Sequence, residues 1–188
     1  MEQQPETTEL DQAELELYLR LQKKVGWKQT GKAVFESFFP ILPFMCSEQA
    51  VIRYFNKIPH VLMWHRKDEN YEGWHMPGGY ILRGESELEW TSRVLNKEVG
   101  LELKRIEFIR WLNHRADVWG LPNHQLACLF LCDAAGEVTK GKFFPLTSLP
   151  EDTMSHHRQM IQHVRAYLIR RETMRKSGIF RDGFDRAP

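Results

Sequence analysis

The sequence predicts an α/β domain in which apolar strands alternate with amphipathic helices, and three observations support this. The stretch 74–101 reads as a short strand, a glycine-rich loop and a helix. Mostly apolar runs of strand length recur at 60–66, 103–112 and 124–132. An apolar repeat with helical spacing follows later in the chain, formed by Met160, Ile161, Val164, Tyr167 and Leu168.

The helix inside 74–101 has both of its ends marked in the sequence. Ser86, followed three residues later by Glu89, forms a capping box, which satisfies the first free backbone N–H groups of a helix. Gly100 comes just after the last apolar position, where a left-handed residue commonly ends a helix. The loop before this helix contains Gly78 and Gly79.

Composition points to a globular protein. With 188 residues, of which 42% are hydrophobic and 27% charged, the chain can bury a sizeable core. No apolar run approaches the roughly 20 residues that span a bilayer, and the acidic start lacks the basic segment of a secretory signal. The three scattered cysteines argue against a disulfide framework, so we expect a cytoplasmic protein. A net charge of +1 gives no reason to expect nucleic-acid binding.

We expect three parts, which are an N-terminal helical extension at 1–32, a main domain at 33–172 and a C-terminal tail at 173–188. Residues 8–24 read as a helix that Thr8 or Asp11 can cap. Its apolar residues lie on two sides, so it packs either on its own domain or on a partner chain. Together with the stretch that follows, this helix suggests a homodimer.

The stretch 33–46 is apolar and aromatic but contains Pro40 and Pro43, which predicts edge strands or an extended arm. A strand pair is expected at 49–55 and 60–66, joined by a turn. The remaining expected elements are a polar linker at 67–73, a loop at 115–123, a connection at 133–142, a short strand at 143–146 and a helix that begins at Ser155.

The stretch 74–101 resembles the Nudix box, a family motif written Gly-x5-Glu-x7-Arg-Glu-U-x-Glu-Glu-x-Gly-U, with U a bulky apolar residue. The matching residues are Gly79, Glu85, Arg93, Leu95, Glu98, Gly100 and Leu101. Two carboxylates of the motif are missing, because Val94 and Lys97 stand in their places. The resemblance implies a Nudix fold, in which a mixed β-sheet is sandwiched between α-helices.

The two missing carboxylates are similar to those missing in the GDP-mannose mannosyl hydrolase branch of the family. That branch uses one magnesium ion, cleaves the sugar C–O bond and employs a histidine as general base. The resemblance implies that His114, in the segment Trp111-Leu-Asn-His114, is this base. The Gln-His pair that the branch carries near its last strand has no counterpart, since Val138 and Thr139 occupy that region.

Positions 94, 97 and 98 share one helix face, which therefore carries a single carboxylate, Glu98. We expect Glu98 to hold Mg²⁺, with Mn²⁺ as the alternative, together with a carbonyl of Gly78 or Gly79, as the resemblance implies. One carboxylate with substrate phosphates is a common magnesium environment. Lys97 would repel a bare ion but favour a bound diphosphate; the alternative is a lysine that points to solvent.

Three further residues complete the expected site. The resemblance makes Arg66, at the end of a strand, a phosphate ligand, although it could equally pair with Asp68 or Glu69. Arg93 orients a catalytic glutamate in the family and is held by a residue in the place of Glu85; here it pairs with Glu85 or Glu89. Surface positions are expected for His156 and His157, and local packing or an outward position for His75.

The expected function is Mg²⁺-dependent hydrolysis of a nucleoside-diphosphate-linked small molecule, with a nucleotide sugar similar to GDP-mannose as the leading substrate. One alternative is cleavage of a pyrophosphate bridge with carboxylates from outside the motif, such as Glu137, Glu151 or Asp152. The other is a Nudix-fold module that binds nucleotides or regulates but has lost catalysis. No nucleic-acid or membrane partner is expected.

Overall fold

The structure is a computed structural model, and it describes residues 10–24, 31–69 and 71–178. The chain divides into two compact units, Met1–Phe38 and Phe39–Pro188. No helix in the described ranges is long and apolar enough to cross a membrane.

The first unit contains two helices, α1 (Gln12–Lys24) and α2 (Lys32–Ser37). Asp11 caps α1 as predicted, because the Glu14 N–H donates to its carboxylate and the Asp11 N–H donates to Glu14, both at 2.9 Å. Thr8, the other predicted cap, lies outside the described residues. The prediction of strands or an extended arm from residue 33 was wrong, because residues 32–37 form a helical turn and only the end of that stretch is extended.

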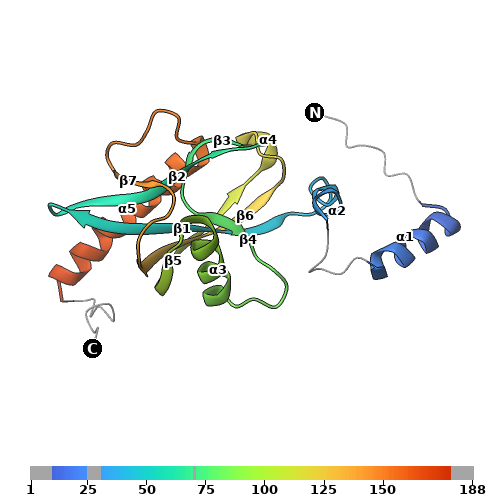
Figure 1. Ribbon diagram of the computed structural model, residues 1–188, viewed down its shortest axis with the longest axis horizontal. Coiled ribbons are helices and arrows are strands. Elements are labelled where there is room, and N and C mark those ends of the chain that lie inside the picture. Colours follow the sequence, from blue (N-terminus) through green and yellow to red (C-terminus); the bar gives the residue numbers. More distant parts are fainter. Residues whose placement is uncertain (1–9, 25–30, 70, 179–188) are drawn as a thin grey trace. The chain divides into compact units, whose positions relative to one another are not determined.

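The second unit is a seven-stranded mixed sheet with helices on both faces, which confirms the predicted fold (Figure 1). Its order is β3-β2-β1-β6-β5, with β4 paired to β1 and β7 paired to β2. Among the strands of the described residues, β1 and β6 pair in parallel and the other pairs are antiparallel. The strands are β1 (Phe44–Phe55), β2 (Ile58–Lys67), β3 (Glu72–His75), β4 (Gly78–Tyr80), β5 (Glu102–His114), β6 (Gln125–Ala135) and β7 (Lys142–Pro145). The helices are α3 (Glu87–Val99), α4 (Ala116–Trp119) and α5 (Ser155–Lys176).

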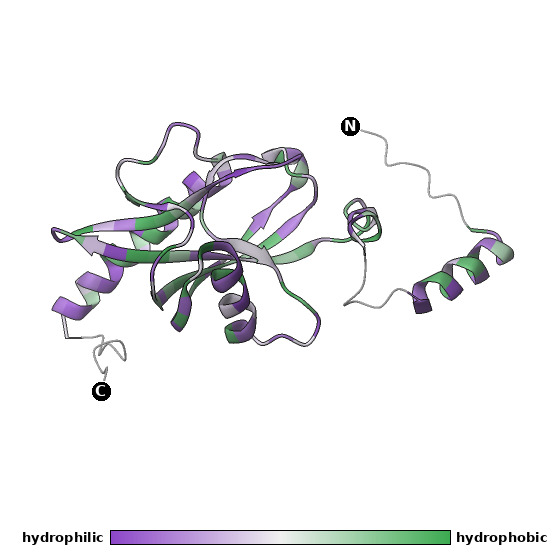
Figure 2. Cartoon of the chain, in the orientation of Figure 1, coloured by the Kyte–Doolittle hydropathy of each residue, from purple (hydrophilic) through white to green (hydrophobic). Residues whose placement is uncertain are grey.

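Two apolar clusters bind the helices to opposite faces of the sheet. One joins Ala50 of β1 to Met160 and Val164 of α5. The other joins Val51 of β1 to Trp90 and Leu95 of α3. Successive residues of a strand point to opposite faces, so β1 supplies both clusters, and long stretches of β1 and β2 are hydrophobic in Figure 2.

Element boundaries differ from the prediction mainly around β1 and before β6. The strand expected at 49–55 begins five residues earlier, at Phe44, directly after Pro43. The loop predicted at 115–123 contains the single turn α4. Helix α5 begins at Ser155, as predicted, and continues to Lys176.

Both predicted ends of α3 are confirmed. Ser86 and Glu89 form the reciprocal capping box, and Gly100 is left-handed at φ 74°. Gly100 also has no room for a side chain, because a Cβ atom there would lie 2.5 Å from Thr139 Cγ2. The end of α3 is therefore fixed by the loop after β6 as well as by backbone conformation.

Gly100→Ala tests this double constraint, with Gly84→Ala as its matched control. Gly84 also has positive φ, but a Cβ atom there meets no atom within 4 Å, so its substitution carries only the left-handed strain of roughly 1 kcal/mol. We expect G100A to lower the free energy of unfolding by about 1–3 kcal/mol more than G84A, because it adds steric overlap. Urea denaturation measures both. Adding Thr139→Ala to G100A should recover most of the excess; equal losses in G84A and G100A would contradict the role of Thr139.

Candidate functional site

Glu98 lies in the last turn of α3, where two donors fix its carboxylate. The backbone N–H of Gly78 donates to Glu98 Oε2 at 3.0 Å, and the indole N–H of Trp64 donates to the same oxygen at 3.2 Å. Among the described residues, no hydrogen bond reaches Oε1. One oxygen is therefore held against the glycine loop, while the other keeps its lone pairs for a ligand.

A second carboxylate, Glu48 of β1, lies against the same loop. Glu48 and Gly78 are register partners in β1 and β4. A Cβ atom on Gly78 would lie 2.4 Å from Glu48 Oε2 and 2.7 Å from its carboxyl carbon, so only glycine leaves room for this group. The Glu48 side chain is buried, and its Oε2 has no hydrogen-bond partner in the described structure.

The two carboxylates influence each other. Burial raises the pKa of Glu48 well above its usual range, and the nearby charge of Glu98 raises it further. Burial also raises the pKa of Glu98, although the hydrogen bonds from Gly78 and Trp64 partly oppose this. Two desolvated acids side by side cannot both ionise cheaply unless a cation lies between or beside them. The pair therefore has the electrostatics of a cation site.

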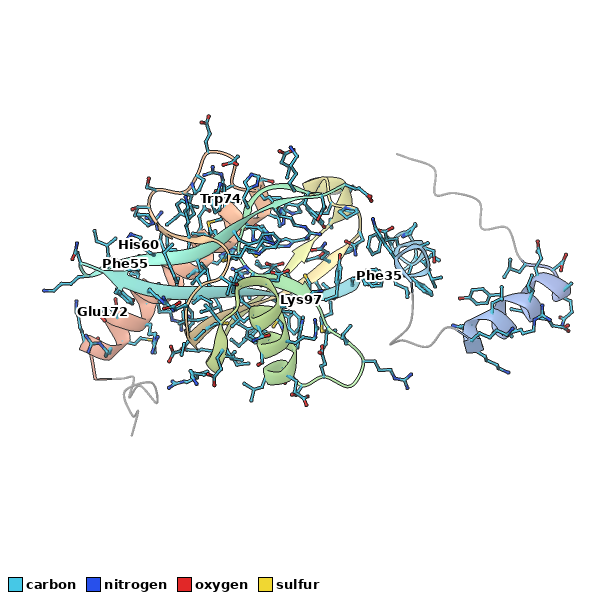
Figure 3. The ribbon with its side chains drawn as sticks, in the orientation of Figure 1. Phe35, Phe55, His60, Trp74, Lys97 and Glu172 are labelled. Atoms are coloured by element: carbon cyan, nitrogen blue, oxygen red, sulfur yellow. The ribbon has the colours of Figure 1, made fainter. Side chains whose placement is uncertain are left out.

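The face of α3 that carries Glu98 runs from a buried residue, Val94, to an exposed one, Lys97. Val94 is buried in the apolar cluster, and a Cβ atom on Gly79 would lie 3.2 Å from it. Lys97 is exposed on α3 (Figure 3), and its charge slightly favours the ionised form of Glu98. The residues that replace the two motif acids thus serve packing in one case and a solvated charge in the other.

Arg93 and Glu85 form a clamp on the loop. The Arg93 guanidinium donates to both oxygens of Glu85, at 2.5 and 2.8 Å, and to the backbone carbonyl of Tyr80 at 2.9 Å. Of the two partners considered for Arg93, the structure shows Glu85, since Glu89 is engaged by Ser86. This pair holds the segment between β4 and α3, and the catalytic role expected for Arg93 and Glu85 stays a prediction.

Arg66 forms the ion pair with Asp68 that was one of its two expected roles, and its role as a phosphate ligand stays a prediction. Its guanidinium pairs with Asp68 and lies 4.4 Å from the ring centroid of Tyr71. Its charge nevertheless reaches the site, where it lowers the pKa values of Glu48 and Glu98. A diphosphate at the two carboxylates would lie within the field of this arginine.

Both loop glycines make hydrogen bonds through their backbones. The Gly79 carbonyl accepts the indole N–H of Trp90 at 2.9 Å. Gly78 uses its N–H for Glu98. The expected role of either carbonyl at a metal ion stays a prediction.

Four buried histidines extend from this site towards β5. Adjacent rings lie 5.3 Å (His75 and His157), 4.4 Å (His157 and His156) and 5.8 Å (His156 and His114) apart, measured between centroids. His157 Nδ1 lies 3.8 Å from Glu48 Oε2 and accepts the N–H of Met76. The expectation that His156 and His157 lie on the surface was wrong: the segment before α5 pairs with Trp74 of β3, which holds the start of the helix against the sheet, and the two histidines are 7% and 3% exposed.

These histidines are held neutral. Burial, followed by nearby positive charge, lowers the pKa of His75 to about 3, and burial lowers the pKa of His156 to about 4. The pKa of His114 is also lowered by burial, and both of its ring nitrogens lack partners in the described structure. His114 thus has an imidazole lone pair that no neighbour uses, as a base requires.

The donor set fits one metal ion better than several. Among residues 10–24, 31–69 and 71–178, no three His, Cys, Asp or Glu side chains are grouped to hold a metal. Two carboxylates, one with an oxygen that lacks any partner, match the one or two that magnesium uses beside water and phosphate oxygens. Glu48 and Glu98 would hold such an ion.

Sequence reasoning missed Glu48 and Trp64. The one signal for Glu48 was an acidic residue inside an apolar stretch, but it fell between two predicted segments. Trp64 lies in a run predicted only as a mostly apolar strand; it is part of the buried cluster, its indole also donates to Glu98, and Lys140 Nζ lies 3.4 Å from its ring centroid. The acids proposed from outside the motif are less favourable, because Glu137 and Glu151 are exposed and Asp152 pairs with His65.

The histidine row predicts acid destabilisation. Below pH 6.5 His75 and His156 are protonated in the unfolded chain, whereas in the folded protein they stay neutral until about pH 3–4. The free energy of unfolding therefore decreases as the pH falls. The raised pKa values of Glu48 and Glu98 act in the opposite direction. A comparison of variants isolates the histidine effect: removing His156 should reduce the pH slope of the unfolding free energy by about 1.4 kcal/mol per pH unit between pH 6.5 and 4.

Urea denaturation of the wild type and His156→Gln at several pH values measures this difference. His124→Gln is the control for loss of a histidine, because His124 lies outside the buried row and bonds to Asn113. Parallel pH profiles for the wild type and H156Q would contradict the prediction.

Comparisons with known proteins agree with this architecture. The family model of the NUDIX domain matches residues 49–164. A MutT NUDIX hydrolase from Burkholderia pseudomallei superimposes with a TM-score of 0.56 at 22% identity, covering 65% of this chain and 98% of that one. The NUDIX domain of Shewanella oneidensis NrtR, in complex with ADP-ribose, gives 0.55 at 17% identity, covering 74% and 99%.

The Ap4A hydrolase of C. elegans gives a TM-score of 0.52 at 15% identity and covers 68% of this chain and 99% of that one. No curated protein matches the sequence. The family match covers more than half of the chain and begins one residue after Glu48. The chain therefore belongs to the NUDIX family.

Proposed function

We propose that this protein is a Mg²⁺-dependent hydrolase of a nucleoside-diphosphate-linked substrate, and that this substrate is a nucleotide sugar. The observation that carries the proposal is the pair of the buried Glu48 and the half-buried Glu98 at the glycine loop, because it fits a cation that binds together with a diphosphate. The solved relatives support the broader substrate class, since one is complexed with ADP-ribose and another is an Ap4A hydrolase.

The charges around the pair suit a diphosphate. The charge of Arg66 acts on both carboxylates, the charge of Lys97 acts on Glu98, and Lys140 Nζ lies 3.4 Å from the ring centroid of Trp64, whose indole donates to Glu98. Magnesium bound there would neutralise the diphosphate and make it a better leaving group. The charge of Lys97 weakens binding of a bare cation, but it favours binding of a cation together with its nucleotide diphosphate.

His114 is the proposed base. Its unengaged nitrogens and neutral state suit proton abstraction from water, and the row of His156 and His157 connects it to Glu48. In C–O cleavage the water oxygen bonds to the anomeric carbon, its proton passes to His114, and the sugar–oxygen bond breaks with its electrons on the diphosphate. His157 is a positioning residue, because its Nδ1 already accepts the Met76 N–H.

The small number of carboxylates favours C–O cleavage over cleavage of a pyrophosphate bridge. Attack on phosphorus in a multi-metal site draws on several acids, whereas two are gathered here. A module that only binds nucleotides would keep the Arg93–Glu85 clamp and the glycine loop but would not need the unengaged histidine.

Turnover of GDP-mannose, ADP-ribose and Ap4A with and without Mg²⁺ tests the proposal. We expect Mg²⁺-dependent release of free sugar from GDP-mannose, with Glu98→Gln and Glu48→Gln lowering kcat/KM by about 100-fold or more. His114→Asn should lower kcat by roughly 10²–10⁴-fold, the usual range for a general base. Glu87→Gln is the matched control, because Glu87 is an exposed acid in the first turn of α3.

Hydrolysis in ¹⁸O-water identifies the bond. Label in the sugar supports C–O cleavage, and label in a phosphate product would establish the pyrophosphate alternative instead. Nucleotide binding without turnover on any of the three substrates would show that the protein is a binding module.

A further inference from the structure

A group of neutral polar side chains lies beside Glu48 and has no part in the chemistry above. It consists of Tyr71, Tyr80, Asn123 and Gln125, which come from three separate segments of the chain. The Gln125 amide N–H₂ lies 2.9 Å from Asn123 Oδ1 and 3.3 Å from the hydroxyl oxygens of both tyrosines. The Tyr80 hydroxyl donates to Asn123 Oδ1 at 3.2 Å.

Asn123 leaves one end of its amide unused. Its Oδ1 receives two donors, which fixes the orientation of the amide. Its Nδ2 is buried and has no hydrogen-bond partner in the described structure, on a residue that is 1% exposed. Buried donors without partners are rare in folded proteins and call for an explanation, such as a ligand or water.

The group is continuous with the carboxylate site. Cys46 donates to Gln125 Oε1 at 3.5 Å, and Cys46 and Glu48 are alternate residues of β1, so they share a face about 7 Å apart. Glu48 is close enough to contribute to the raised pKa of Tyr71, after the larger effect of burial. On the other side, Gln125 is the register partner of His114 in β5 and β6. The group thus borders both the proposed metal site and the proposed base.

The chemistry of these side chains selects a neutral ligand with hydroxyl groups. Amide N–H groups donate, and phenol oxygens both donate and accept, as sugar hydroxyls do. None of the four side chains carries a charge that would pair with a phosphate, and the Arg66 guanidinium, which lies 4.4 Å from the Tyr71 ring centroid, is paired with Asp68. The tyrosine rings add apolar surface beside the polar groups.

We propose that Asn123, Gln125, Tyr71 and Tyr80 form the subsite for the sugar half of the substrate, with Asn123 Nδ2 donating to a sugar oxygen. This inference rests on the proposed function, because it places the sugar beyond a diphosphate at Glu48 and Glu98. The anomeric carbon then lies between the carboxylate pair and His114.

Calorimetric binding of GDP-mannose and GDP to the full chain, with Ca²⁺ in place of Mg²⁺ so that the cation is kept while turnover is suppressed, tests the subsite. Asn123→Leu should raise the Kd of GDP-mannose about 10-fold and leave the Kd of GDP unchanged, since GDP lacks the sugar. Asn113→Leu is the matched control, because Asn113 is exposed on the opposite face of β5 and bonds to His124; it should change neither Kd. Chromatography after each titration establishes that GDP-mannose is intact.

If N123L does not fold, as thermal unfolding would reveal, Tyr71→Phe takes its place, with a smaller expected rise in the Kd of GDP-mannose alone. An equal change for both ligands, or no change for either, would overturn the subsite. The subsite would also be overturned if the wild type bound GDP-mannose no more tightly than GDP. In that case the turnover experiments would still decide whether the protein is a hydrolase. Binding of neither ligand would overturn the proposed function and the subsite together.

Discussion

The contact between the Glu48 carboxylate and the backbone of Gly78 determines the layout of the candidate site. A side chain on Gly78 would overlap the carboxylate at 2.4 Å, so the absence of a Cβ atom is what lets β1 and β4 pair with an acid between them. The same glycine donates its N–H to Glu98. One residue thus brings together two acids from a strand and a helix.

This arrangement concentrates polar groups in a part of the molecule that is otherwise apolar. A hydrophobic cluster joins the sheet to α5, and Glu48 of β1 lies beside His157 at the start of that helix. Burying unpaired polar groups opposes folding. The histidines limit this cost by staying neutral, and the flanking apolar clusters supply the stability that the polar end lacks.

Local signals predicted the parts of the fold that local interactions decide. The capping box of Ser86 and Glu89 and the left-handed Gly100 involve hydrogen bonds within a few residues, so the sequence was sufficient for α3. Prediction failed at 32–37, where a single helical turn lacks a clear repeat. It also split the long strand β1, and this concealed Glu48, which lies between the predicted arm and the predicted strand.

The sequence by itself determined the family, the strand–loop–helix around Gly79, the pairing of Arg93 with Glu85 or Glu89, and Glu98 as the remaining acid of the motif. Only the tertiary structure decided which groups join Glu98. Glu48, Trp64 and His157 lie far apart in the chain, and they meet because strand pairing and the packing of α5 bring their backbones together. Spacing along a sequence specifies neighbours within a turn of helix or along one strand; contacts across a sheet depend on a register that only the folded chain reveals.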